Sequence, residues 1–190
     1  MAEMRLFHSA FARHREVVDL SMQHILPDVE RAARIIRAAL GKGRTIFACG
    51  NGGSAADSQH FAAELVGRYH KNRRGMPAIA LTVDTSALTA LGNDYGFESV
   101  FKRQVEALGR RGDVLVAFTT SGSSKNVIEA IRAACGRGMK VIALTGARGK
   151  SLGKRADVCV VVPSEETARI QEIHEIVYHS WCEYLDRRAL

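Results

Sequence analysis

The sequence predicts an α/β fold, a three-layer sandwich in which helices cover both faces of a five-stranded parallel sheet preceded by N-terminal helices. Three observations support this fold class. Short β-branched runs alternate with stretches of helical periodicity, and these runs are continuously apolar, as in strands buried on both faces. Two hydroxyl-rich glycine turns follow strands, where ligands bind in open parallel sheets. The 190 residues, 46% of them hydrophobic and 25% charged, suit one domain with a full core.

The first 43 residues are expected to be helical. Apolar residues at helical spacing run from Leu6 to Ile25, Pro27 interrupts the pattern, and a second helix capped by Asp28 can continue to the glycines after Leu40. The first helix carries apolar side chains suited to a contact with a partner subunit: Phe7, Phe11, Val17, Val18 and Leu20. We expect this helical segment, residues 1–43, to precede a parallel α/β core over residues 44–190 within a single domain.

The core is expected to be a series of strand–helix–strand units. The expected strands are the apolar runs at residues 45–49, 78–83, 114–119, 141–145 and 158–162. Helical periodicity lies near residues 55–69, 99–108, 126–137 and 168–185. Crossovers of this kind join parallel strands and are almost always right-handed.

Charge and composition exclude several classes of protein. The formal net charge is +7, but the basic residues are interspersed with Asp and Glu along the expected helices, which favours a solvated surface over a nucleic-acid interface. A mildly positive field would also attract a small anionic substrate. The charged N-terminal residues do not resemble a secretory signal, and no apolar run is long enough to span a bilayer. The four cysteines, at 49, 135, 159 and 182, form no Cys-x-x-Cys pair, so reduced thiols in a cytoplasmic protein are expected.

The first glycine turn, Cys-Gly-Asn-Gly-Gly-Ser at residues 49–54, lacks the spacing of a dinucleotide fingerprint and the Gly-Lys-Ser/Thr of a P-loop. Its glycines would let a ligand approach the backbone, while Asn51 and Ser54 offer hydrogen bonds. The alternative is an ordinary strand-to-helix connector.

The second turn concentrates hydroxyl groups around one glycine just before an expected helix. Its hydroxyl residues are Thr119, Thr120, Ser121, Ser123 and Ser124. Hydroxyls and free amides at a helix start could hold a phosphate without a basic side chain. An N-cap cluster is the alternative, although one Ser would suffice for that.

Two expected helices carry side chains that could work on a substrate or bind a metal. His60 and Glu64 are four residues apart, and so are Gln171, Glu175 and His179 in the last helix, so each set lies on one helix face. His174 points elsewhere and is expected to be structural. If the two faces meet, two imidazoles, a carboxylate and an amide oxygen would form a set acceptable to zinc. A surface pair of His60 and Glu64 is the alternative.

Asn93 and Asp94 follow the second expected strand and a short helical turn. They could form a loop with local Asx hydrogen bonds, or they could orient substrate hydroxyls.

Taken together, five motifs resemble the sugar isomerase (SIS) domain family, in particular its members that isomerise phosphorylated heptoses, over nearly the whole chain. The motifs are Cys-Gly-Asn-Gly-Gly-Ser, His60 to Tyr69, Gly-Asn-Asp-Tyr-Gly at 92–96, Thr-Ser-Gly-x-Ser at 120–124 and Arg-Ile-Gln-Glu-Ile-His at 169–174. The resemblance implies a flavodoxin-like fold and a cytoplasmic homotetramer joined by the N-terminal helices. It also implies conversion of sedoheptulose 7-phosphate to D-glycero-D-manno-heptose 7-phosphate through an enediolate, as the first step of nucleotide-heptose and lipopolysaccharide synthesis.

The same resemblance assigns the site residues. Contacts to the sugar are implied for Asn51, Gly52, Gly53, Ser54, Asn93 and Asp94, and contacts to the phosphate for Thr119, Thr120, Ser121 and Ser124. One zinc ion per subunit would be held by His60, Glu64, Gln171 and His179, so Glu64 and Gln171 would also face the substrate. Since the isomerisation needs one base and one acid, we assign these roles to Glu64 and His179 as a hypothesis. Ligation of zinc and proton transfer by Glu64 compete, and both stay open here.

A different function is the main alternative. One relative with the same fold and tetramer binds the replication initiator protein without needing catalysis, and it lacks the acid and the imidazole at the positions of Glu64 and His179. Because both residues are present in this chain, the enzyme is favoured.

Overall fold

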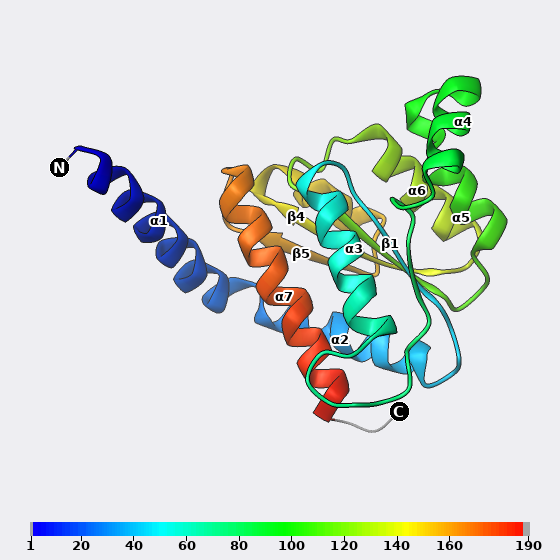
Figure 1. The fold of residues 1–190 in the computed structure, drawn as a ribbon, viewed down its shortest axis with the longest axis horizontal. Helices are drawn as coiled ribbons and strands as arrows, with labels where there is room; N and C mark the ends of the chain where they lie inside the picture. The colour runs from blue at the N-terminus through cyan, green and yellow to red at the C-terminus, as the bar shows by residue number, and fades with distance from the viewer. Residues whose placement is uncertain (1, 188–190) are drawn as a thin grey trace.

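The computed structural model describes residues 2–187, which form one five-stranded parallel sheet with the order β2-β1-β3-β4-β5 (Figure 1). The strands are β1 (Ile46–Cys49), β2 (Ala78–Ala80), β3 (Val114–Thr119), β4 (Lys140–Gly146) and β5 (Val158–Val162). β1 and β3 are buried at every position, as their continuous apolar runs predict. The predicted fold class is confirmed.

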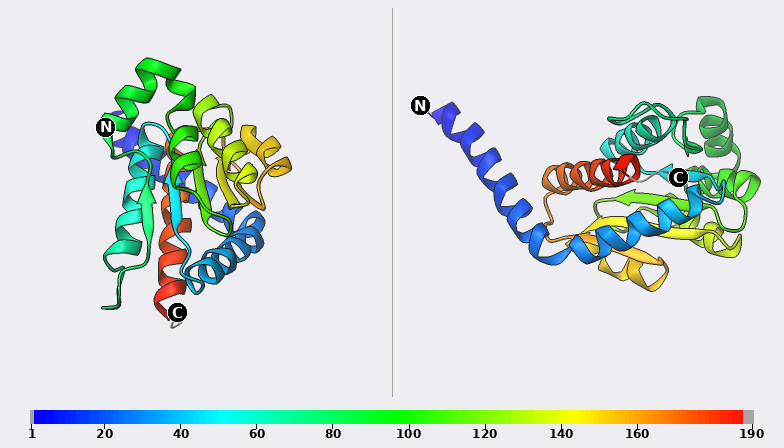
Figure 2. Two further views of the ribbon diagram at one scale, coloured as in Figure 1. Left: turned by 90° about the vertical axis from the view of Figure 1, so that its right-hand side faces the viewer. Right: turned by 90° about the horizontal axis from the view of Figure 1, so that it is seen from below.

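Helices cover both faces of the sheet (Figure 2). On one face lie α2 (Leu26–Leu40), α3 (Gly53–Val66) and α7 (Thr167–Arg187), whose side chains Ile36, Phe61 and Trp181 pack in one cluster with the strands. On the other face lie α5 (Lys102–Leu108), α6 (Lys125–Gly136) and the 3₁₀ segment η2 (Ala147–Lys154), which pack through a second cluster. α3 and α7 run side by side in the same direction.

The N-terminal helix α1 (Ala2–His24) projects from this body (Figures 1 and 2). A single residue, Ile25, separates it from α2. The predicted break between two helices is therefore present, but it precedes Pro27, which lies in the first turn of α2 as proline readily does. Asp28 also lies in that first turn and is not the cap that was expected. α1 contacts α7 through a hydrogen bond from Arg169 Nη1 to the Ala10 carbonyl (2.6 Å) and a contact of 2.7 Å between His14 Nδ1 and a Glu172 carboxylate oxygen. Its outer part leaves Phe7 and Phe11 exposed.

The region between β2 and β3 differs from the expectation. β2 ends at Ala80 because Asp84 caps a new helix, α4 (Thr85–Tyr95), by accepting a hydrogen bond from the Ala87 amide (2.9 Å). The 3₁₀ turn η1 (Phe97–Ser99) follows, so α5 begins at residue 102 rather than near 99. η2 was not predicted, since its run of glycines and basic residues has no helical periodicity.

The strand order fixes where a ligand can bind. β1 pairs with β2 on one side and with β3 on the other, so the connections leaving β1 and β3 diverge to opposite faces of the sheet. A crevice outside the carboxyl ends of such strands is the usual ligand site of open α/β sheets. Both hydroxyl-rich glycine turns lie at this point.

Candidate functional site

The two glycine turns are joined directly by a pair of amides. Asn51, in the first turn, and Asn126, in the first turn of α6, each donate a hydrogen bond to the other's side-chain oxygen at 2.8 Å. This reciprocal pair fixes the end of β1 against the start of α6. A cavity of about 480 Å³ lies beside it, lined by Asn51, Ser124 and Asn126 on one side and by Gly96, Phe97 and Glu98 on the other. This volume suits a small-molecule ligand.

The first turn packs closely against its own helix and against Gln171. A Cβ atom on Gly50 would lie 2.5 Å from the Ser54 carbonyl oxygen, so this position requires glycine. A Cβ atom on Gly53 would lie 2.4 Å from Gln171 Nε2 and 2.7 Å from Oε1, so a larger residue there would displace the Gln171 amide. Gly52 has a φ of +57°, a backbone conformation that favours glycine. Ser54 is buried in the first turn of α3. The structure therefore places a side-chain amide of α7 at the start of α3.

The second turn holds its hydroxyl groups in a network. The Gly122 amide donates to Thr119 Oγ1 (3.2 Å), and Ser121 Oγ accepts from both the amide and the hydroxyl of Ser123 (3.2 and 2.9 Å). Ser124 Oγ lies 3.4 Å from Thr119 Oγ1 at the N-cap of α6. Ser121 is exposed, so its hydroxyl can face a ligand. An N-cap alone needs only one of these side chains.

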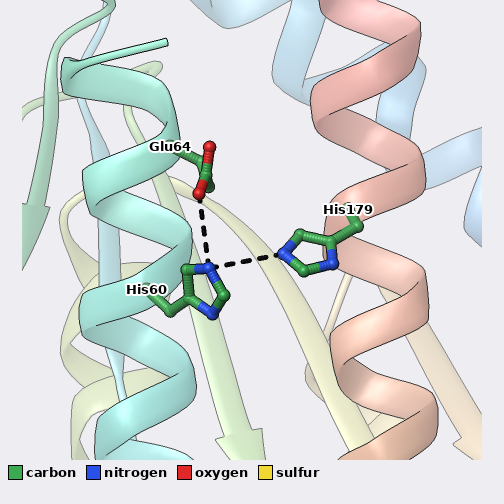
Figure 3. Close-up of side chains that lie close together, drawn as sticks. All are labelled: His60, Glu64 and His179. Atoms are coloured by element: carbon green, nitrogen blue, oxygen red, sulfur yellow. Dashed lines mark hydrogen bonds and ion pairs between the residues drawn. The ribbon is translucent and has the colours of Figure 1, made fainter. Parts of the chain in front are cut away.

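Two helices bring His60, Glu64 and His179 together (Figure 3). His60 Nε2 lies 3.3 Å from Glu64 Oε1 and 3.4 Å from His179 Nε2. The predicted meeting of α3 and α7 is thus observed for these three side chains. His60 and Glu64 do form the i,i+4 pair that was the alternative, and His179 extends this pair to a cluster of three.

Further groups surround this cluster. Tyr178, buried on α7, has its hydroxyl 2.9 Å from His60 Nδ1, which leaves His60 Nε2 facing Glu64 and His179. Glu175 Oε1 lies 3.7 Å from the same Nδ1. Burial, and then His60, lower the pKa of His179 below its usual value. Burial and the charge of Glu175 raise the pKa of Asp57 to about 7, although His60 opposes this.

The donor set fits a zinc ion. Zinc bound by nitrogen and oxygen at about 2.0–2.1 Å in a tetrahedron needs neighbouring ligand atoms about 3.3–3.4 Å apart. The two contacts of His60 Nε2 have this length, and all three ligand atoms lie within 4.8 Å of one another. Three protein ligands leave a position open, which is typical of catalytic rather than structural zinc.

Two groups of predicted residues lie apart from this cluster. Gln171 precedes His179 by two helical turns, about 12 Å along α7, and its amide contacts Gly53 instead. Asn93 and Asp94 are exposed in the last turn of α4, where Asn93 Nδ2 donates to Asp94 Oδ1 (2.8 Å). Among the residues that the structure describes, no hydrogen bond or ion pair links Asn93 or Asp94 to His60, Glu64 or His179.

Two residues of the site were missed in the sequence, Asn126 and Tyr178. Asn126 sits two residues after the second turn, so an amide just inside the helix start was the available signal. Nothing in the spacing distinguishes Tyr178 from a core residue. His174 is fully buried, as predicted for a structural residue, and burial lowers its pKa to about 4, while the nearby backbone of Thr145 opposes the shift.

The four cysteines are unpaired, as expected. Cys49 and Cys182 are buried, and burial raises the pKa of each thiol to about 12. Thiols with such a pKa stay protonated near neutral pH, so they are poor nucleophiles.

Comparison with known proteins defines the family. The SIS domain profile matches residues 11–146. The chain belongs to the SIS domain family. The phosphoheptose isomerase of Aliarcobacter butzleri is 51% identical over 176 residues, which cover 93% of each chain. This SIS domain therefore has close relatives over almost its whole length.

Solved SIS domain structures agree with this assignment. A phosphoheptose isomerase from Neisseria gonorrhoeae superposes with a TM-score of 0.92 at 46% identity, and one from Francisella tularensis with 0.95 at 37%; each comparison covers 99% of this chain and 100% of the other. The sugar isomerase domain of an RpiR transcription factor from Sphaerobacter thermophilus, at 17% identity and a TM-score of 0.69, shares the fold alone.

Proposed function

We propose that this SIS domain catalyses the aldose–ketose isomerisation of sedoheptulose 7-phosphate to D-glycero-D-manno-heptose 7-phosphate. The observation that carries the proposal is the meeting of Glu64 and His179 around His60. These residues lie on α3, which follows the first glycine turn, and on α7, whose Gln171 lies against that turn. A carboxylate and an imidazole supply the base and the acid that the reaction needs. The relatives named phosphoheptose isomerase support the choice of a heptose phosphate.

The second turn would hold the phosphate ester. Amides at the start of α6 and the hydroxyls of Thr119, Thr120, Ser121 and Ser124 offer donors to phosphate oxygens, and the N-terminus of α6 favours negative charge. The first turn, through Asn51, Gly52, Gly53 and Ser54, would contact the sugar hydroxyls, together with Gln171. Asn93 and Asp94 are assigned to sugar contacts on the family resemblance alone.

Two proton movements complete the reaction. Glu64 would remove a proton from C1 of the open-chain ketose, which gives a cis-enediolate, and would return the proton to C2. The hydrogen of the C1 hydroxyl group passes to the oxygen on C2. His179 would carry this second transfer. Its lowered pKa keeps the imidazole neutral near pH 7, so that one ring nitrogen can accept while the other donates.

The same cluster would hold one zinc ion through His60, Glu64 and His179. The family resemblance also implies Gln171 as a ligand, but its amide lies against Gly53 and would have to move to reach this ion. When bound, zinc would polarise the substrate carbonyl and stabilise negative charge on its oxygen. Glu64 then has two roles, as a zinc ligand and as the base, and these two roles compete for the same carboxylate.

The proposal extends to the assembly and its setting. Exposed apolar side chains on the projecting α1 support a homotetramer joined by the N-terminal helices: Met4, Leu6, Phe7 and Phe11. No helix in the described part of the chain has the length and apolar character needed to cross a membrane. We assign the enzyme to the cytoplasm and its product to nucleotide-heptose synthesis for lipopolysaccharide. The non-catalytic alternative, binding of the replication initiator, is not favoured, because the candidate base and acid are both present and close together.

One experiment tests the activity. Purified protein loaded with zinc is incubated with sedoheptulose 7-phosphate, and formation of the aldose is followed by NMR, with protein treated with a chelator in parallel. Aldose formation that depends on protein concentration is expected. Absence of aldose in the zinc-loaded sample, together with capture of the replication initiator, would replace the proposal with the regulatory alternative.

A further inference from the structure

The positive charge of this protein is concentrated at one edge of the sheet. Five segments lead into the strands, at residues 41–45, 67–77, 109–113, 137–140 and 154–157, and they contain twelve of the 27 Lys and Arg residues but only two of the 20 Asp and Glu residues. The remainder of the chain holds 15 basic and 18 acidic residues. The net positive charge of the protein therefore comes from these five segments, at the edge of the sheet where the strands begin. The twelve basic residues are Lys42, Arg44, Arg68, Lys71, Arg73, Arg74, Arg110, Arg111, Arg137, Lys140, Lys154 and Arg155.

These residues are scattered in sequence and gathered in space. In an all-parallel sheet every connection that enters a strand returns to the same edge, opposite the edge where the two glycine turns lie. All twelve except Arg73 are exposed. The view that the basic residues are simply dispersed over a solvated surface is therefore incomplete.

A cavity of about 1110 Å³ opens at this edge. It lies between the C-terminal ends of α2, α3 and α7 and the segment 67–77, which runs along the bottom of Figure 1 beside the end of α7. Its walls include apolar side chains, namely Leu40, Val66, Met76, Ile79 and Leu185. Lys71 and Arg74 also line it, and neither forms an ion pair with any acidic residue in the described part of the chain.

Among the described residues that line the cavity, the single carboxylate, Asp186, is already neutralised. Asp186 accepts hydrogen bonds from the amides of His70 (2.7 Å) and Lys71 (2.9 Å) and from Arg73 Nε (2.8 Å). The Arg73 guanidinium also donates to the carbonyls of Glu64 and Leu65 at the end of α3. These bonds hold the segment 67–77 in place, so the cavity is preformed and its free charge is positive.

We propose that this cavity binds an organic anion that combines at least two negative charges with an apolar ring system, the chemistry of a nucleoside diphosphate. Lys71 and Arg74 would meet the charged groups, and the apolar walls would cover the ring. The volume suits a ligand of this size. The cavity lies at the edge of the sheet opposite the glycine turns, so its ligand would not occupy the proposed phosphate subsite. Its segment 67–77 does reach the proposed base, since Arg73 donates to the Glu64 carbonyl.

Calorimetric titration with ADP tests the proposal, with adenosine and inorganic phosphate as its two halves. ADP is expected to bind with a dissociation constant below about 1 mM, and each half at least ten times more weakly. The double variant Lys71→Gln/Arg74→Gln should weaken ADP binding at least tenfold. Lys150→Gln, an exposed lysine on η2 outside the cavity, is the matched control and should leave binding unchanged.

Several results would overturn the proposal. One is a dissociation constant for ADP above about 1 mM. Another is a dissociation constant for adenosine or phosphate equal to that for ADP. Displacement of ADP by sedoheptulose 7-phosphate would assign ADP to the second glycine turn instead. A changed oligomer mass in the double variant would identify this face as a subunit contact. Isomerase activity is measured without ADP, so failure here leaves the proposed function untouched.

Discussion

At the residue scale, Glu64 and His179 are the side chains on which the proposed chemistry depends. Replacing either by Gln keeps its size and removes its ability to exchange a proton. Loss of a positioned acid or base typically costs about 10²–10⁴-fold in rate, so we expect kcat to fall by at least about 10²-fold in Glu64→Gln and His179→Gln.

Folding should be unaffected by these substitutions, because both side chains are partly exposed. The midpoint of thermal unfolding checks this. Glu183→Gln, a partly exposed residue one turn beyond His179 on α7 that pairs with Arg187 rather than with the cluster, serves as the control with unchanged kcat. Near-normal turnover in either site variant would remove the assignment.

Tyr178 has a separate role that zinc affinity can reveal. Its hydroxyl lies 2.9 Å from His60 Nδ1 and so favours presentation of Nε2 to the cluster. Loss of such a partner typically weakens metal binding about 10–100-fold. We expect a decrease of this size for Tyr178→Phe in competition with a zinc chelator, while Tyr184→Phe on the same helix leaves zinc affinity unchanged. Equal zinc affinity in wild type and Tyr178→Phe would show that the contact is only structural.

At the scale of the elements, the second turn depends on contact between two glycines. Gly122 has a φ of +69°, and a Cβ atom there would lie 2.2 Å from Gly149 Cα in η2. Gly122→Ala must therefore move the turn or η2, and we expect it to cost about 2 kcal/mol in the free energy of unfolding and to raise KM.

Gly136→Ala is the matched control, since Gly136 ends α6 and nothing lies within 4 Å of the place that an added methyl group would occupy. It should be neutral or stabilise by up to about 1 kcal/mol. Denaturant unfolding compares the two variants. Equal stability of Gly122→Ala and Gly136→Ala would show that the turn has no such constraint.

The projecting helix α1 determines assembly in our proposal. Phe11 is 78% exposed, and the proposed tetramer would bury it. Phe11→Asp should lower the molar mass measured by light scattering after gel filtration. Ser9→Asp, two residues away and so about 200° around the helix, should leave the mass unchanged. An unaltered mass for Phe11→Asp would exclude this face from the subunit contact.

At the scale of the whole molecule, His174 links stability to pH. Its pKa is about 4 in the folded protein and about 6.5 when unfolded. Between these values the unfolded chain binds a proton that the folded chain does not. His174 therefore contributes about 3 kcal/mol above pH 6.5, and this contribution is lost as the pH falls toward 4.

Asp57 acts in the opposite direction over the same range, because its pKa is raised to about 7 and the folded state holds the proton. The contribution of His174 is therefore measured as the difference between wild type and His174→Gln in denaturant unfolding, near pH 7 and near pH 4.5. The difference should shrink at the lower pH. A difference that does not change with pH would contradict the assigned pKa.

The sequence by itself determined the sheet, most of the helices and the two turns, because each depends on local patterns. Continuous apolar runs define the buried strands, Pro27 marks the first turn of α2, and glycines next to hydroxyls mark where strands end and helices begin. The spacing of four between His60 and Glu64 also fixed their common face. The sequence predicted only a short helical turn in the place of α4, whose start depends on the Asp84 cap. It did not predict η2, because a glycine-rich segment has no helical periodicity.

Only the tertiary structure decided which distant groups meet. The packing of α3 beside α7 places His179 and Tyr178 against His60, sets Gln171 against Gly53, and lets Asn51 pair with Asn126. It also gathers basic residues from five connections at one edge. Contacts between residues 75 or more positions apart depend on the relative placement of whole helices and strands, and no local pattern in the chain encodes that placement.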